Sequence, residues 1–186
     1  MFFKALFSIT LLPLLATAAH AQKLIPASSE IAFVSKQMGV PVEGRFKKFD
    51  AQLNFDPKKP EAGKLSFNID TGSASMGAPE VDSELPKANW FGVAKFPKAT
   101  FESSAIKSTG PGRFDVSGTL TIKGNAQTVV VPVQLAQAGG STTATGSFGI
   151  KRLVFKIGEN EWADTSMVAN DVQVKFRLAL SGMAPI

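Results

Sequence analysis

The stretch DVQVKFRLAL, residues 171–180, alternates polar and apolar side chains from Asp171 to Leu178. Val172, Val174, Phe176, Leu178 and Leu180 fall on one face, and Asp171, Gln173, Lys175 and Arg177 fall on the other. Alternation with a period of two is typical of a β-strand that buries one side. The stretch therefore predicts a strand of an antiparallel sheet that has one apolar face.

The same alternation recurs along most of the chain. It predicts eight strands, near 29–36, 42–56, 63–71, 98–108, 112–123, 126–137, 141–150 and 168–182. Glycine-rich breaks at 110–112, 124–125 and 139–140 are suited to tight hairpins. We expect an all-β fold, an eight-stranded antiparallel sheet closed as a barrel because closure removes exposed edges. A sandwich is the alternative that the pattern leaves open.

Three places depart from the alternation. The apolar phase slips between Phe46 and Phe49, which predicts a β-bulge at Lys47-Lys48. The 72–97 connection is too long for a hairpin, and Pro79 followed by acidic residues predicts a short helix there. Residues 151–167 form a second long connection.

The N-terminus has the features of a secretory leader. Lys4 precedes an apolar stretch of about a dozen residues, short of the roughly 20 that span a bilayer. Ala19-His20-Ala21 then places small residues where a signal peptidase cleaves. We predict a cleaved signal peptide over 1–21 and a single exported domain over 22–186.

Composition argues against most catalytic chemistry. The chain has no cysteine and no tyrosine, and its one histidine lies in the leader. The mature chain therefore lacks the usual general base and the usual metal ligands, so we expect no catalytic residues, no metal and no cofactor. A lipid-modifying enzyme built on acidic pairs such as Glu80 and Asp82 is a further alternative. The net charge of +5 is scattered, which indicates no nucleic-acid partner and at most transient contact with a membrane surface.

An ordered series of short segments resembles the YceI-like family of exported, polyisoprenoid-binding, lipocalin-like barrels. The segments are IAFVSK at 31–36, VEGRF at 42–46, LNFDP at 53–57, WF at 90–91, KFPKATF at 95–101 and VSGTLTIKG at 116–124. The resemblance implies a periplasmic eight-stranded barrel whose lumen holds a long apolar chain. The chain departs from many members at Gln37, where they have histidine, and at Lys156, where they have glycine.

We therefore expect a non-enzymatic carrier or scavenger that encloses an isoprenoid or acyl lipid. The alternative is a barrel packed solid with its own side chains, acting as a protein-interaction or stress-adaptation module. Small inward residues such as Gly44, Ala99, Ser103, Ala105 and Gly118 favour free volume, and a phenylalanine-rich wall suits a hydrocarbon tail. The sequence leaves the oligomeric state open.

Two groups of side chains are predicted to contact the lipid. The lumen wall is assigned to Phe33, Phe46, Phe67, Ile69, Phe101, Phe114, Val116, Leu120, Val131, Phe148, Phe176 and Leu178. The candidates for binding a polar or phosphate head group are Lys36, Arg45, Lys151 and Arg152. The same apolar residues could instead be ordinary core, and Trp90 and Trp162 could cap the mouth or plug one end.

Overall fold

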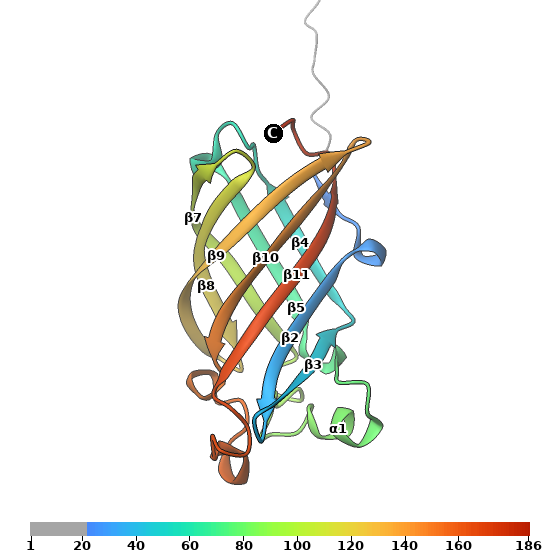
Figure 1. Ribbon diagram of the computed structural model, residues 1–186, viewed down its shortest axis with the longest axis vertical. Coiled ribbons are helices and arrows are strands. Elements are labelled where there is room, and N and C mark those ends of the chain that lie inside the picture. Colours follow the sequence, from blue (N-terminus) through green and yellow to red (C-terminus); the bar gives the residue numbers. More distant parts are fainter. Residues whose placement is uncertain (1–21) are drawn as a thin grey trace, which may run out of the picture.

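The computed structural model describes residues 22–186, and this part of the chain is almost entirely β-structure (Figure 1). It contains eleven strands, one α-helix and five short 3-10 helices. The strands are β1 Lys23–Leu24, β2 Glu30–Gln37, β3 Val40–Phe46, β4 Phe49–Asn54, β5 Lys64–Asp70, β6 Ala74–Ser75, β7 Lys98–Gly110, β8 Arg113–Ile122, β9 Asn125–Ala138, β10 Ser141–Lys151 and β11 Asp171–Ser181. The helix is α1 Pro79–Glu84, and the 3-10 helices are η1 Pro26–Ser28, η2 Pro60–Ala62, η3 Thr71–Ser73, η4 Arg152–Phe155 and η5 Asn160–Ala163.

The all-β class, the antiparallel pairing and the short helix are confirmed, but the predicted number of eight strands is wrong. The stretch predicted as one strand over 42–56 divides into β3 and β4, because the chain leaves the ladder at Lys47-Lys48. The expected bulge is therefore an interruption of the strand. Strands β1 and β6 have two residues each, too few for a period-two pattern to be visible in the sequence.

The sheet curls so that its two ends meet. Its hydrogen-bonded order is β4-β5-β7-β8-β9-β10-β11-β2-β3-β6, with β1 added on β11. Strand β3 pairs with β2 at one end of this path and β4 pairs with β5 at the other, although only two residues separate β3 from β4. The curled antiparallel sheet is consistent with a lipocalin-like barrel, and Figure 1 shows its long strands tilted around a common axis.

A bulge in β7 changes which side chains face inward. The register with β8 shifts between Ser103 and Ala105. As a result Ala105 is exposed and Ile106 is buried. Ala105 therefore does not contribute to the interior as the alternation suggested. Ser103 uses its hydroxyl to accept a hydrogen bond from the backbone N–H of Leu65 at 2.8 Å.

The lower end of the barrel in Figure 1 is covered by α1 and by the two long connections that precede β7 and β11. Asp82 of α1 accepts hydrogen bonds from the Ser75 hydroxyl and the Met76 N–H, both at 2.6 Å. These bonds stabilise the ionised carboxylate and lower the pKa of Asp82 below its ordinary value of 3.8. The helix is thereby attached to β6.

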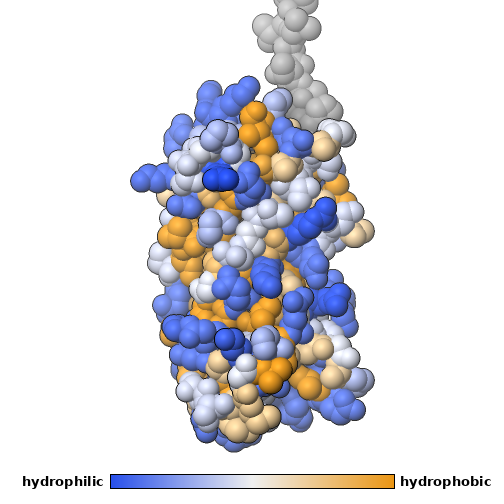
Figure 2. All heavy atoms as spheres, in the orientation of Figure 1, coloured by the Kyte–Doolittle hydropathy of each residue, from blue (hydrophilic) through white to orange (hydrophobic). Residues whose placement is uncertain are grey.

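The predicted leader, residues 1–21, lies outside the described residues. None of the helices within residues 22–186 has the length and apolar character needed to cross a bilayer. On the outer face seen in Figure 2, hydrophilic residues are interspersed among hydrophobic ones. This mixture fits a sheet whose polar side is wet and whose apolar side faces the axis.

Candidate ligand-binding cavity

An elongated cavity of about 180 Å³ lies inside the curled sheet. Its lining residues are all apolar, and they come from nine strands, from the connections that follow β4 and precede β7, and from the tail after β11. They are Ile31, Phe46, Leu53, Phe55, Leu65, Phe67, Ile69, Phe91, Ala99, Phe101, Phe114, Val116, Leu120, Ile122, Val131, Val133, Leu135, Ala144, Phe148, Val174, Phe176, Leu178, Leu180 and Met183. An apolar hollow of comparable size stays dry and accepts apolar ligands.

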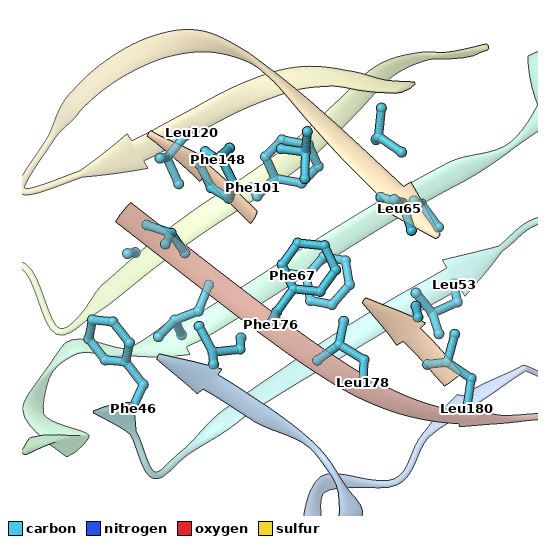
Figure 3. A pocket seen from close by; sticks show the side chains of 18 of the residues that line it. Phe46, Leu53, Leu65, Phe67, Phe101, Leu120, Phe148, Phe176, Leu178 and Leu180 are labelled. Atoms are coloured by element: carbon cyan, nitrogen blue, oxygen red, sulfur yellow. The ribbon is translucent and has the colours of Figure 1, made fainter. Parts of the chain in front are cut away.

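The cavity is long and narrow. On β8 its lining runs from Phe114 to Ile122, a rise of about 26 Å along the strand. A strand tilt of about 40° reduces this to roughly 20 Å along the barrel axis. Figure 3 shows Phe46 at one end of the cavity and Leu53 and Leu180 at the other. These dimensions suit a linear hydrocarbon chain better than a compact ligand.

The structure brings together the wall residues that the sequence predicted, with one exception. Phe46, Phe67, Ile69, Phe101, Phe114, Val116, Leu120, Val131, Phe148, Phe176 and Leu178 all line the cavity. Phe33 does not line it, because its ring packs over Gly44 of β3 and against Phe46, with ring centroids 5.4 Å apart. Whether the wall binds a lipid stays a prediction.

The inward glycines do not enlarge the cavity as expected, because phenylalanine rings cover them. A Cβ at Gly44 would lie 2.3 Å from the ring of Phe33, and one at Gly146 would lie 2.4 Å from the ring of Phe176. The same hypothetical atom at Gly146 would meet a backbone carbonyl oxygen at 2.3 Å. These glycines therefore make room for aromatic rings that lie flat against the sheet.

The rings of Phe46 and Phe91 form the floor of the cavity at its lower end, and Phe33 packs against Phe46 outside it. The Phe46 ring lies 5.4 Å from Phe33 and 5.7 Å from Phe91, the latter in an edge-on arrangement. Trp90 and Trp162 pack together with ring centroids 5.5 Å apart. They belong to the two long connections that cover this end of the barrel, and Trp90 packs against the core.

Arg152 is a structural anchor, and its assignment as a head-group ligand is wrong. Its side chain is only 2% exposed. All five of its N–H donors reach backbone carbonyls, namely those of Ile157, Gly158, Trp162, Val168 and Ala169, at 2.7–3.0 Å. Burial lowers the pKa of Arg152. No donor is left for a ligand, because the guanidinium holds the 152–169 connection against the end of the sheet.

The other three head-group candidates lie on the outer surface. Lys36 and Arg45 are exposed on the polar faces of β2 and β3. Lys151 is exposed and pairs with Asp171 of β11. None of the three appears among the residues that line the cavity, so they do not form the predicted site. Their strand positions placed them on the wet face, as the alternation itself required.

Sequence reasoning missed a second buried cation, Lys123, in the turn after β8. Its ammonium donates to the carbonyls of Ala88 and Lys156 and to the Glu159 carboxylate, at 2.5–2.8 Å. Lys156 has a left-handed φ of 56°, a conformation that glycine adopts freely. The bonding partners of Lys123 are more than 30 residues away in sequence, so no local pattern could reveal them.

A family model for the YceI-like domain matches residues 23–180. The chain belongs to the YceI-like family. Its sequence is 36% identical to Protein YceI of Salmonella arizonae over 143 residues, which cover 73% of this chain and 74% of that protein. A UPF0312 protein of Azotobacter vinelandii is 40% identical over 96 residues, and the matched part spans about half the length of that relative.

Solved structures with the same fold include one close in sequence and one distant. Burkholderia cenocepacia BcnA is 46% identical to the YceI-like chain, with a TM-score of 0.81 over 84% of this chain and 98% of BcnA. A polyisoprenoid binding domain from Saccharophagus degradans superposes with a TM-score of 0.71 over 89% of this chain and 99% of that domain. At 19% identity, this second likeness concerns the fold alone.

Proposed function

We propose that the protein is an exported carrier or scavenger of a long-chain amphiphilic lipid, of polyisoprenoid or fatty-acyl type. The observation that carries the proposal is the elongated cavity with its wholly apolar wall. A wall of this kind binds by removing hydrocarbon from water and does not discriminate strongly between apolar chains. The proposal therefore names a class of ligand and not one compound.

The energetics of burial support this class. Each methylene group removed from water contributes about 0.8 kcal/mol, so a tail of a dozen carbons contributes roughly 10 kcal/mol. Immobilising the chain and losing free translation offset a large part of this gain. A net affinity in the micromolar range corresponds to about 8 kcal/mol, so we expect it for tails longer than a dozen carbons, without any polar contact to the tail.

Family membership and the predicted leader add to the proposal. The Saccharophagus degradans relative of the same fold is a polyisoprenoid binding domain, which favours isoprenoids as the first probes. Cleavage after Ala21 would deliver the domain to the periplasm, where a lipid that crosses between membranes needs shielding from water. The free space inside the sheet supports a carrier over a solid interaction module. Because only apolar side chains line that space, binding is favoured over catalysis.

Native mass spectrometry of the protein purified from its own periplasm, followed by solvent extraction, tests the proposal. We expect a retained lipid, and we expect the emptied protein to take up prenyl and long-chain acyl probes. A variant with a charge in the wall, Phe176→Asp, is the control and should retain nothing. A wild-type protein that carries no lipid and takes up no probe would contradict the proposal.

A further inference from the structure

The segment that follows β11, residues 182–186, covers the upper end of the cavity. Met183 of this segment is one of the residues that line the cavity. In the turn between β7 and β8, a Cβ added to Gly112 would lie 3.7 Å from the side chain of Ile186. The segment therefore runs from the end of β11 to the β7–β8 turn, at the upper end of the barrel in Figure 1.

One side chain, that of Gln137 on β9, binds this segment through two hydrogen bonds. Its amide N–H donates to the carbonyl of Ala184 at 2.8 Å, and its amide oxygen accepts from the backbone N–H of Ile186 at 3.0 Å. Both bonded residues come directly after Met183 or close to it in sequence. The position of Met183 in the cavity wall therefore depends on Gln137.

The apolar wall ends where Gln137 stands. Leu135 on β9 and Ala144 on β10 line the cavity. The next positions on the same faces of these strands are Gln137 and Thr142, which pair in the ladder and share a side-chain hydrogen bond of 3.0 Å. Met183 is thus the last apolar side chain that a ligand meets before this polar bridge.

The two ends of the cavity differ in how firmly they are held. Phe46 of the floor belongs to β3, and the connection that carries Phe91 is fixed by Lys123, whose ammonium donates to the carbonyl of Ala88. Every residue of 182–186, by contrast, is at least partly exposed. A segment with few buried contacts opens at a low free energy. The upper boundary is therefore the one that a ligand can displace.

The distance between the two boundaries corresponds to a chain length. The lining extends roughly 20 Å along the barrel axis. An extended chain advances about 1.2 Å per bond, so this length holds about sixteen carbons. A shorter chain leaves part of the wall without a contact and gains less from burial. A longer chain has to displace Met183 and break both bonds of Gln137.

We infer that Met183 is the residue that determines the length of the bound chain, because it is the upper stop of the cavity. The preferred ligand has an apolar chain of about sixteen carbons in its main chain, the length of about four isoprene units. An unbranched thioether adapts its shape to the end of such a chain. Gln137 is a positioning residue that holds the stop in place. This inference rests on the proposed lipid-binding function and adds the length of the tail.

Hydrocarbon probes without a head group test the inference: dodecene, hexadecene and eicosene, each delivered from cyclodextrin and displacing a fluorescent naphthylamine from the delipidated protein. The affinity of the wild type should rise from dodecene to hexadecene by about tenfold for every two carbons. It should then fall by about tenfold from hexadecene to eicosene, because the longer chain breaks the two hydrogen bonds of Gln137.

Variants of the stop should shift this profile in opposite directions. Met183→Ala should bind eicosene about tenfold more tightly than the wild type, and Met183→Trp should bind hexadecene about tenfold more weakly. Both should leave dodecene binding unchanged, so a general loss of structure does not produce the pattern. Gln137→Ala should bind eicosene about threefold more tightly, with hexadecene unchanged. Met167→Ala and Gln173→Ala, at exposed positions, are the matched controls and should keep the wild-type profile.

The outcomes separate this inference from the proposed function. If dodecene and the other probes all fail to bind the wild type, the lipid-carrier proposal fails. If the probes bind and the affinity of the wild type still rises from hexadecene to eicosene, the stop is refuted while the carrier proposal stands. The stop is equally refuted if Met183→Ala and Met183→Trp both keep the wild-type profile.

Discussion

Replacing Arg152 by methionine removes a buried guanidinium while keeping an unbranched side chain. The wild-type side chain is 2% exposed and donates five hydrogen bonds to backbone carbonyls of the 157–169 segment. In the variant these carbonyls lose their partner at the end of the sheet. The connection that holds Trp162 should then loosen or separate from β2.

The expected loss of stability follows from two opposing energies, that of the hydrogen bonds and that of burying the charge. Each hydrogen bond to a charged group contributes about 1.5–3 kcal/mol, but burying the guanidinium costs several kcal/mol in return. Removing one partner of a buried charged arrangement typically costs about 3–5 kcal/mol, because the remaining polar groups stay buried and unpaired. We expect this loss for Arg152→Met, which corresponds to a melting temperature lower by roughly 6–20 °C.

Urea denaturation measures the loss, with tryptophan fluorescence reporting on the Trp90–Trp162 contact and circular dichroism reporting on the sheet. Arg45→Met, on the exposed face of β3, is the matched control and should stay within about 0.5 kcal/mol of the wild type. Lipid uptake by the remaining folded Arg152→Met protein should be retained. If Arg152→Met is as stable as the wild type but no longer binds lipid, Arg152 is a ligand contact and the anchoring role is refuted.

Three further variants test the wall, the packing and the lower end. Phe176→Asp should abolish probe uptake and cost several kcal/mol, because an unpaired carboxylate would face an apolar cavity; normal uptake would show that this face is not the binding wall. Gly146→Ala should lower the free energy of unfolding by about 1–3 kcal/mol, because its new Cβ meets a ring and a carbonyl. Gly149→Ala is the matched control and should be neutral, because the nearest neighbour of its Cβ would be 3.9 Å away. Equal urea midpoints for the two variants would contradict this prediction. The pKa of Asp82 is lowered in the folded state. Its contribution to the stability of the folded protein is therefore complete above about pH 3.8 and disappears as the pH falls through the lowered pKa. The difference in the free energy of unfolding between wild type and Asp82→Asn should therefore shrink as the pH falls. A difference that grows below pH 4 would contradict this prediction.

The predicted wall shows what a one-dimensional pattern can supply. Strand β11 places Phe176 and Leu178 on the cavity as the alternation in 171–180 predicted. Phe33 has the same periodicity and yet lies off the cavity, because its position beyond the floor depends on how β2 and β3 end relative to the other strands. The alternation predicts whether a side chain faces into or out of the barrel, but it does not predict the position of the residue along the barrel axis.

The head-group candidates failed for a related reason. Lys36 and Arg45 follow the polar phase of their strands and are exposed, so the pattern itself argued against them. Arg152 begins an irregular connection, where no period constrains its direction, and its five acceptors come from residues that fold back on it. The partners of Lys123 are likewise distant in sequence.

The sequence by itself determined the antiparallel β-architecture, the apolar inner face and the family, because each depends on the order of side chains along single strands. The tertiary structure alone decided that β3 and β4 part at Lys47-Lys48, that phenylalanine rings cover the inward glycines, and that both buried cations are saturated. These features depend on which distant segments meet when the sheet curls. Side-chain periodicity reports on the neighbours along a strand, whereas the closure of the sheet selects the neighbours across it.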